Sequence, residues 1–320
     1  MYQYNSTMYQ NNSTMYQYNS TMYQYNSIMN HCYSVLGNSI NSCTNNAYAG
    51  VDVLSINDFS YDTNQEGVGY NVLGAGVFGK VYTATFRGDK VAIKSYFVEE
   101  MRGILAEAVC LKMLNTTGAT PKLYGILPNP NPLDERQICL VMEMVGEGIT
   151  LRRSLEDNAL NIKQKLSIAL CLVNGLLRIH QRGVLINDIK DDNIIVYDSA
   201  IGYQAKFIDF GHASYGFVKT YKGDTSMAYH LAPEVRNHQP TTPASDIYSL
   251  GYTLSFFAVN TLVDLANRCT LHHPIQRPSL YQMASEIMVL LNTYQPQQML
   301  LSLSSTIPIQ SNNAPLTAVM

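Results

Sequence analysis

The chain of 320 residues is 14% charged and carries a formal net charge of −3 at pH 7. Its Lys and Arg residues are not clustered, so the sequence offers no basic field for nucleic acid or for an anionic membrane, and neither partner is expected. Six widely spaced cysteines without a CxxC pair argue against a zinc site and against a small disulfide framework. Such thiols are typical of a reducing compartment, so we expect a cytoplasmic location.

The N-terminal segment repeats with a period of seven residues. MYQYNST begins at Met1 and again at Met15, with altered copies between and after them. A coiled coil needs apolar residues at two positions of each heptad and flanking charges, whereas Tyr, Asn, Gln and Ser dominate here. This composition buries too little apolar surface to offset chain entropy. We therefore expect residues 1–50 to be disordered and to favour self-association, and residues 51–66 to form a linker.

From about Gly67 the pattern becomes that of a folded domain. Alternating residues in 80–86 and a β-branched run in 90–97 predict two antiparallel strands joined by a short turn. Glu99–Asn115 has apolar residues at helical spacing and should form one amphipathic helix. Two further strands, KLYGIL and ICLVMEMV, are expected on either side of a loop at 128–133.

Beyond Gly148 the pattern is mostly helical as far as Leu291, with short strands expected near 194–197 and 206–209. A mostly β lobe therefore precedes a mostly α lobe, with the hinge near 144–148, and the expected fold class is α+β with two lobes. The expected bounds are 67–145 for the N-lobe, 146–293 for the C-lobe and 294–320 for a disordered tail.

The most apolar stretch is Leu250–Ala266. It contains Asn260 and Asp264 and falls short of a membrane span, which needs about 20 predominantly apolar residues. We expect one buried helix of the core here.

A glycine-rich motif lies in LGAGVFGKVY, where Gly74, Gly76 and Gly79 follow the order GxGxxG. Alone this is weak evidence, because a dinucleotide-binding turn has the same glycines, although there they open a helix. A strand-like pattern follows here, so we expect a hairpin flap whose backbone N–H groups approach phosphate oxygens. Lys94, which ends VAIK on the next strand, would meet those phosphates as a point charge.

A buried lysine needs a counter-charge, and the expected helix offers Glu99, Glu100 and Glu107. Glu107 is favoured because the apolar Leu111 follows it by one turn and places it on the packed face. The alternative is that all three are surface carboxylates.

LINDIKDDNIIV, at 185–196, sets three aspartates and a lysine between two apolar runs. In isolation it could be a solvated turn between two buried strands, or a phosphoryl-transfer site. The order of motifs along the chain distinguishes these readings. The Gly-rich loop, VAIK, the helix glutamate, Asp188 with Asn193 five residues on, IDFG at 208–211 and APE at 232–234 resemble a eukaryotic protein kinase.

This resemblance covers about 70–291 and implies ATP and Mg²⁺ as ligands and a protein as substrate. Asp188 would orient the acceptor hydroxyl and accept its proton, while Lys190 would neutralise charge on the transferred phosphoryl group. Asn193 and Asp209 would bind magnesium. The other implied nucleotide contacts are Gly74, Gly76 and Gly79 in the flap, Val81, Ala92 and Ile195 around adenine, Glu143 and Met144 in the hinge, and Met142 at the back pocket. Arg277 would pair with Glu234 to hold the substrate-binding segment.

The chain departs from the family at Ile186-Asn187-Asp188, where His-Arg-Asp is usual. Ile186 is expected to fill the same apolar stack, with Leu111, Leu123 and Phe210. Asn187 lacks the charge with which the arginine gathers a phosphate on the activation segment. We therefore predict an activity that does not depend on phosphorylation of Thr220, Tyr221, Thr225 or Ser226.

Two further departures concern the substrate side. Tyr229 lies one residue farther from APE than usual, so the threonine that usually contacts Asp188 is not assigned, and Thr225 and Ser226 are both candidates. The short interval from Asp246 to Arg277 is expected to lack a helix that often docks partners.

Three functions fit these motifs. An active serine/threonine kinase is favoured, because the implied catalytic residues are all present and Lys190 resembles that class. A pseudokinase scaffold that binds ATP without significant transfer is the alternative, suggested by Ile186-Asn187 and the short C-lobe. A small-molecule kinase shares the Asp-x4-Asn loop, but APE together with Arg277 argues against it.

Overall fold

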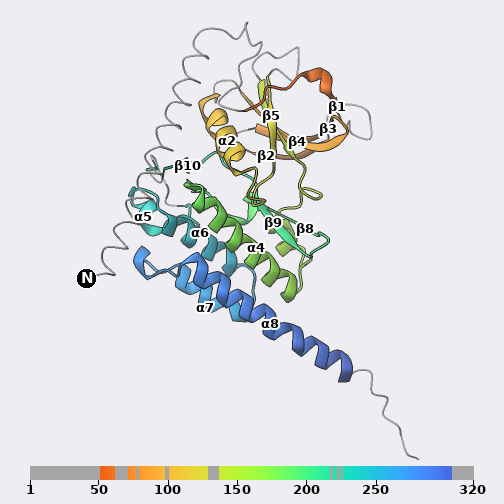
Figure 1. The fold of residues 1–320 in the computed structure, drawn as a ribbon. Helices are drawn as coiled ribbons and strands as arrows, with labels where there is room; N and C mark the ends of the chain where they lie inside the picture. The colour runs from red at the N-terminus through yellow and green to blue at the C-terminus, as the bar shows by residue number, and fades with distance from the viewer. Residues whose placement is uncertain are drawn as a thin grey trace, which may run out of the picture.

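A computed structural model describes residues 51–304, except 62–70, 77–78, 98–100, 129–136, 217–218, 222–224 and 226. The expectations for the heptapeptide repeats at 1–50 and for the end of the chain beyond Ser304 lie outside the described residues. Figure 1 shows a sheet-rich lobe above a helical lobe, with the strands β8 and β9 between them. The two-lobed α+β fold expected from the sequence is confirmed.

The N-lobe is a six-stranded antiparallel sheet with one helix, α2 (Met101–Leu114), against it. Its strands are β1 (Phe59–Tyr61), β2 (Val72–Gly76), β3 (Gly79–Phe86), β4 (Asp89–Phe97), β5 (Leu123–Pro128) and β6 (Gln137–Glu143). They follow the order β1-β3-β4-β6-β5, and β2 also pairs with β3. All four strands predicted between Lys80 and Val145 are therefore present.

The register of the strands assigns residues to the two faces of the sheet. Lys94 lies opposite Val81 and Leu140, and Ala92 lies opposite Met142. Because opposed residues share a face and successive residues alternate, these side chains point the same way. Leu140 and Met142 join the core formed with α2, so this face looks toward α2 and the C-lobe. The outer face forms a separate buried cluster of Tyr82, Ala84, Phe86, Val91, Ile93, Leu127, Cys139 and Val141.

Residues 51–61, here called the N-terminal strap, pack on this sheet. The Leu54 N–H donates to Ile126 O and the Ile126 N–H donates to Asp52 O, each at 2.8 Å. Val51 is buried in the core with α2, and Phe59 pairs with Phe86 across β1 and β3. The prediction that residues 51–66 form a linker is therefore wrong for residues 51–61, whereas residues 62–66 lie outside the described residues. Its apolar residues complete a sheet whose other strands come later in the sequence.

Gly125 makes room for the strap. A Cβ at this position would overlap the carbonyl oxygen of Asp52 and lie 2.9 Å from Leu54 Cγ. We therefore expect Gly125→Ala to displace the strap and to lower the free energy of unfolding by about 1–3 kcal/mol, as in other overpacked sites. Urea unfolding and limited proteolysis within the strap would measure this.

The control for that prediction is Gly103→Ala. Gly103 is exposed on α2, and a Cβ there meets no atom within 4 Å. Alanine should stabilise the helix slightly, by about 0.5–1 kcal/mol. Equal unfolding midpoints for Gly125→Ala and the wild type would contradict the tight fit of the strap.

The C-lobe is built around the buried helix α4, which packs against α8 and β9. A capping box starts α4, because Asn161 and Gln164 exchange side-chain and backbone hydrogen bonds. Its helices are α3 (Leu151–Glu156), α4 (Ile162–Gln181), α5 (Pro233–Arg236), α6 (Pro243–Ser255), α7 (Asn260–Cys269) and α8 (Leu280–Ser304). Its short strands are β7 (Val184–Leu185), β8 (Ile194–Tyr197), β9 (Gln204–Phe207) and β10 (Ser214–Tyr215).

The single core helix expected at Leu250–Ala266 is wrong. The chain turns between α6 and α7, and Ala258 in this turn has a left-handed φ of 52°. The two helices cross so closely that a Cβ on Gly251 would overlap the Cβ of Cys269. The turn at 256–259 contains neither Gly nor Pro, so no local breaker residue marks this boundary.

One expected helix boundary is not tested, and one expected boundary of the C-terminal tail is wrong. The helix expected from Glu99 is described only from Met101, since 98–100 lie outside the described residues. The tail expected from Tyr294 begins too early, because α8 continues to Ser304. The expectation rested on a composition rich in Gln, Ser, Asn and Pro, but Gln, Met and Leu in this stretch are good helix formers. In the part of the chain that the structure describes, no helix has the length and hydropathy needed to cross a bilayer.

Candidate active site

A buried carboxylate from α6 holds the loop that precedes Asp188. Asp246 accepts hydrogen bonds from the backbone N–H groups of Ile186 and Asn187, each at 2.9 Å. It also accepts one from His180 Nε2 on α4, at 2.9 Å. Asn187 adopts a left-handed φ of 64°, which Asn tolerates better than most residues. Asp246 thus fixes the backbone immediately before Asp188.

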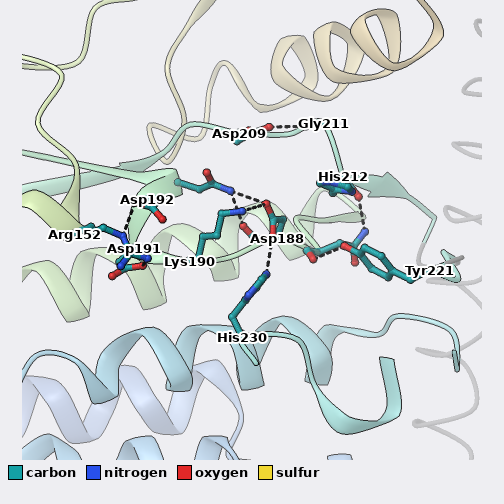
Figure 2. Close-up of polar contacts among 12 residues, drawn as sticks. Arg152, Asp188, Lys190, Asp191, Asp192, Asp209, Gly211, His212, Tyr221 and His230 are labelled. Atoms are coloured by element: carbon teal, nitrogen blue, oxygen red, sulfur yellow. Dashed lines mark hydrogen bonds and ion pairs between the residues drawn. The ribbon is translucent and has the colours of Figure 1, made fainter. Parts of the chain in front are cut away.

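Three donors surround the Asp188 carboxylate (Figure 2). Lys190 Nζ and Asn193 Nδ2 each lie 2.8 Å from Oδ2, and His230 Nε2 lies 2.8 Å from Oδ1. Burial acts to raise the pKa of Asp188, but the hydrogen bonds and charges of His230 and Lys190 outweigh it and hold the pKa well below its usual range. Asp188 is therefore ionised near neutral pH and can only accept hydrogen bonds.

A second charged group lies on the inner face of the sheet. Lys94 Nζ is 3.0 Å from Glu107 Oε1 on α2 and 3.2 Å from Asp209 Oδ1. The predicted ion pair between Lys94 and Glu107 is present. Burial alone would lower the pKa of Lys94, but the two carboxylates raise it above its ordinary value. Lys94 is therefore a fixed positive charge that joins strand β4, helix α2 and the segment after β9.

Two further donors to Glu107 were not predicted. The Tyr96 hydroxyl donates to Oε2, and the backbone N–H of Phe210 donates to Oε1 at 3.4 Å. Burial first, and then the charge of Glu107, raise the pKa of Tyr96, so its hydroxyl stays protonated. Tyr96 could have been found from the sequence, because it follows Lys94 by two residues on a strand and must share its face.

Asn193 and Asp209 supply oxygen atoms suited to a magnesium ion. Asn193 Nδ2 donates to the Asp188 carbonyl and carboxylate at 3.0 and 2.8 Å, which leaves its Oδ1 as the acceptor. Asp209 is partly exposed, and its Oδ1 accepts from the Gly211 N–H at 3.0 Å. Within the described residues no cluster of three or more His, Cys, Asp or Glu could cage a metal. One carboxylate and one amide oxygen nevertheless fit Mg²⁺, which usually takes its remaining ligands from phosphates and water.

The three flap glycines lie on a hairpin, as expected. Gly74 and Gly76 are on β2 and Gly79 is on β3, with 77–78 outside the described residues. A Cβ on Gly74 would meet nothing within 4 Å, so packing does not require a glycine there. Its absent side chain instead leaves the backbone open to a ligand.

The residues implied for adenine come from both lobes. Val81 and Ala92 share the inner face of the sheet with Lys94, as their register shows. Ile195 lies on β8 of the C-lobe, two residues after Asn193. Met142, implied at the back pocket, is buried opposite Ala92.

The hinge begins where β6 ends, at Glu143. Its side chain accepts two hydrogen bonds from Lys206 Nζ on β9, at 2.7 and 2.8 Å, and one from the Lys122 N–H at 2.9 Å. The Glu143 carboxylate therefore ties the two lobes together, and its backbone N–H donates to Lys122 O at 2.8 Å. Met144 follows just beyond the end of β6, before a turn at Gly146, where a Cβ would lie 2.6 Å from Tyr197 Cβ.

Neutral hydrogen bonds join Asn187 to the segment after Asp209. Asn187 Nδ2 donates to His212 O at 3.0 Å and to Ser214 Oγ at 2.9 Å. The Tyr221 hydroxyl donates to the Asn187 carbonyl at 2.6 Å (Figure 2). These bonds connect the catalytic loop to the segment after Asp209 without a charged group.

These contacts give a structural reason for the predicted independence from phosphorylation. We expect phosphatase treatment to leave the rate of phosphate transfer unchanged, because no phosphate is needed to hold Tyr221 against Asn187. Phosphate transfer should be assayed before and after treatment, with mass spectrometry to confirm removal. Loss of turnover after removal of a phosphate from Thr220, Tyr221, Thr225 or Ser226 would show that this expectation is wrong.

Of the two candidates for the contact with Asp188, Thr225 is not supported and Ser226 is not tested. Thr225 Oγ1 donates to Arg236 O at 3.3 Å, and Ser226 lies outside the described residues. His230 contacts Asp188 instead, from the segment that leads into α5. The sequence gives no local signal for this contact, which spans 42 positions.

Several structural expectations around the site are met. Arg277 donates to both carboxylate oxygens of Glu234, at 2.6 and 2.8 Å. Ile186 is buried in one cluster with the three residues of its expected apolar stack, Leu111, Leu123 and Phe210. Between α6 and the 3₁₀ turn at Pro274–Gln276, a stretch described without gaps, α7 is the one helix. The short stretch between α6 and this turn, which lies within the interval from Asp246 to Arg277, therefore contains one helix.

Arg152 on α3 is a further residue that sequence analysis missed. Its guanidinium donates to Asp191, at 3.0 Å, and to Asp192 (Figure 2). Both carboxylates lie between Lys190 and Asn193 in the same loop, and Asp191 is buried. Arg152 thus neutralises the two aspartates and holds the loop against α3.

Comparison with known proteins identifies the family of this arrangement. Residues 69–266 match the family model of the protein kinase domain. The chain is 29% identical over 205 residues to the serine/threonine-protein kinase-transforming protein mos of Moloney murine sarcoma virus (strain ts110), covering 57% of this chain and 56% of that protein. It is 28% identical over 214 residues to the proto-oncogene serine/threonine-protein kinase mos of Sus scrofa, covering 57% and 58%.

A third relative is mitogen-activated protein kinase kinase kinase 10 of Homo sapiens, at 28% identity over 201 residues, covering 57% of this chain and 20% of that protein. The chain thus spans a little over half the length of the two mos proteins. The matched region contains Lys94, Glu107, Asp188, Asn193 and Asp209. The chain belongs to the eukaryotic protein kinase superfamily.

Proposed function

We propose that the chain is an ATP-dependent protein kinase that transfers the γ-phosphate of ATP to Ser or Thr hydroxyl groups of protein substrates. The main support for this proposal is that two clusters of charged residues, one around Lys94 and one around Asp188, are both present with all their expected partners. Lys94 is paired with Glu107 and Asp209, and Asp188 is held by Lys190 and Asn193. Phosphoryl transfer needs mainly positioning and fixed charge, and these residues supply both.

Each residue has a defined part in the reaction. Lys94 holds the phosphates of ATP. Asp209 and Asn193 would hold Mg²⁺, which would supply positive charge to screen those phosphates. Asp188 orients the acceptor hydroxyl and takes its proton as the new bond from oxygen to the γ-phosphorus forms. The bond between the γ-phosphorus and the bridging oxygen of ADP breaks in the same step, and Lys190 neutralises charge on the transferred group. The products are ADP, the phosphorylated protein and one proton.

The choice of Ser and Thr as acceptors rests on two supports. Lys190 follows Asp188 by two residues, a spacing that resembles serine/threonine kinases. The two mos proteins are named as serine/threonine-protein kinases. The buried Arg277–Glu234 pair beneath α5 favours a peptide platform over a small-molecule acceptor. We place the activity in the cytoplasm, where the free thiols Cys110, Cys139, Cys171 and Cys269 stay reduced.

Phosphate transfer from labelled ATP tests the proposal. The purified full chain should label a generic protein substrate in the presence of Mg²⁺, and phosphoamino acid analysis should show phosphoserine or phosphothreonine. Asp188→Asn keeps the shape of the side chain but removes its charge, and it should lower kcat by roughly 10²- to 10⁴-fold. Equal labelling by both proteins would overturn the proposal. Binding of ATP without transfer by the wild type would instead support the scaffold function.

A further inference from the structure

The hydrogen bonds at Asp188 leave one acceptor position for a substrate. An ionised carboxylate has about four lone-pair sites, two on each oxygen. Among the described residues, Lys190 and Asn193 fill both sites of Oδ2, and His230 fills one site of Oδ1. The remaining site of Oδ1 is therefore where an acceptor hydroxyl can donate. That site lies beside the imidazole of His230.

The protonation of His230 follows from its partner. Asp188 already accepts hydrogen bonds from the Lys190 ammonium and the Asn193 amide, so its carboxylate is the acceptor toward His230 as well, and His230 Nε2 carries the hydrogen in their 2.8 Å contact. Both the neutral Nε2–H tautomer and the imidazolium make this bond. The bond therefore fixes the direction of the Asp188 carboxylate whether or not the ring is charged.

The backbone that carries His230 is held in place by buried neighbours and hydrogen bonds. Leu231 and Ala232, which follow it, are buried at 5% and 0% exposure, and the Leu231 N–H donates to Ala228 O at 2.9 Å. Two residues further on, Glu234 is held by Arg277. The histidine side chain itself is 19% exposed and points from this segment to Asp188 (Figure 2). Such support is what a residue needs if it is to hold another side chain within a few tenths of an ångström.

We propose that His230 is a positioning residue for phosphoryl transfer, whose Nε2–H holds the Asp188 carboxylate so that the remaining lone pair of Oδ1 receives the acceptor hydroxyl. This role rests on the proposed kinase activity. His230 belongs to the segment that leads into the substrate platform, whereas Lys190 and Asn193 belong to the catalytic loop itself. The contact therefore couples the placement of the protein substrate to the orientation of Asp188.

Two variants of similar length separate the hydrogen bond from the volume of the ring. His230→Gln keeps an N–H donor near the position of Nε2, and His230→Met removes it. We expect His230→Met to lower kcat roughly 10- to 100-fold, because a small misplacement of a reacting group has effects of this size. His230→Gln should recover most of that loss. The KM for ATP should stay within about twofold in both, because His230 contacts the group that binds the acceptor and not the group that binds nucleotide.

The controls address folding and proton transfer. His273→Met replaces an exposed histidine and should behave as the wild type. Thermal unfolding should show similar midpoints for His230→Gln and His230→Met, and their pH profiles of kcat should keep the shape of the wild-type profile. If His230→Met does not fold, His230→Ala with and without added imidazole makes the same comparison, and imidazole should restore kcat.

The outcomes distinguish this role from its alternatives. Wild-type kcat in His230→Met, or equal losses in His230→Met and His230→Gln, would overturn the positioning role while the kinase activity stands. Loss of one limb of the pH profile in both variants would identify the ring as the proton acceptor and would also overturn it. A wild-type chain without phosphate transfer would overturn the proposed function itself.

Discussion

Lys94→Met is expected to abolish most phosphate transfer, with a loss of roughly 10²- to 10³-fold in kcat, the usual effect of removing one preorganised electrostatic donor. Methionine has nearly the length of lysine but no charge, so the phosphates of ATP lose their partner on β4. The change also leaves Glu107, at 1% exposure, and Asp209 facing each other without the cation between them. Helix α2 should then lose its ionic contact with the sheet.

Kinetics and unfolding should be measured on the same preparations of Lys94→Met. Lys90→Met is the matched control, because Lys90 lies on the same strand and is exposed. Glu107→Gln should reproduce part of the kinetic loss, since it removes the charge that holds Lys94 in place. Wild-type kcat in Lys94→Met would contradict the role of Lys94, whereas a loss of the same size in Lys90→Met would assign the effect to the strand as a whole.

Arg277→Met is expected to give the largest loss of stability of any single change considered for this chain. The guanidinium is fully buried and donates to both oxygens of Glu234, to Leu271 O at 2.9 Å, to Ala244 O at 2.9 Å and to His272 O at 3.2 Å. All five of its N–H groups are thus used. Removing it leaves Glu234 as an unpaired buried charge, which costs about 3–5 kcal/mol. For a domain of this size the expected fall in Tm is on the order of 10 °C.

Two companion variants sharpen this stability prediction. Arg277→Lys keeps the charge but loses the planar fork, so its unfolding free energy should fall between those of the wild type and Arg277→Met. Arg277→Met combined with Glu234→Met should recover part of the loss, because no buried charge then remains unpaired. Arg268 is the control, since its ion pairs with Asp264 and Glu286 are largely exposed and Arg268→Met should cost at most about 1 kcal/mol. Equal Tm values for Arg277→Met and Arg268→Met would contradict the prediction.

The sequence predicted correctly the contacts of residues whose positions follow from local patterns. The strand alternation around Lys94 and the helical spacing around Glu107 put both on packed faces, and the structure brings them within 3.0 Å. Asp188 and Asn193 lie in one loop, so their contact follows from their spacing. The Arg277–Glu234 pair required the family resemblance, because 43 positions separate the two residues.

What the sequence could not show depends on tertiary contacts. His230, in the segment that leads into α5, contacts Asp188 across 42 positions, and nothing near either residue in the sequence indicates this contact. The N-terminal strap pairs with β3 and β5, which come later in the chain, so its short apolar pattern looked like a linker. The turn between α6 and α7 contains neither Gly nor Pro, so this apolar run gives no local sign of it.

The proposed activity requires that Lys94, Asp188, Asn193 and Asp209 act together on one magnesium-bound triphosphate. The decisive experiment is calorimetric binding of a nonhydrolysable ATP analogue, with and without Mg²⁺, to the wild type and to Asp209→Asn. We expect Mg²⁺ to tighten binding to the wild type by at least about tenfold, equivalent to 1.4 kcal/mol, and we expect Asp209→Asn to lose this gain. Equal affinities of the wild type in the presence and absence of Mg²⁺, or an undiminished gain in Asp209→Asn, would contradict it.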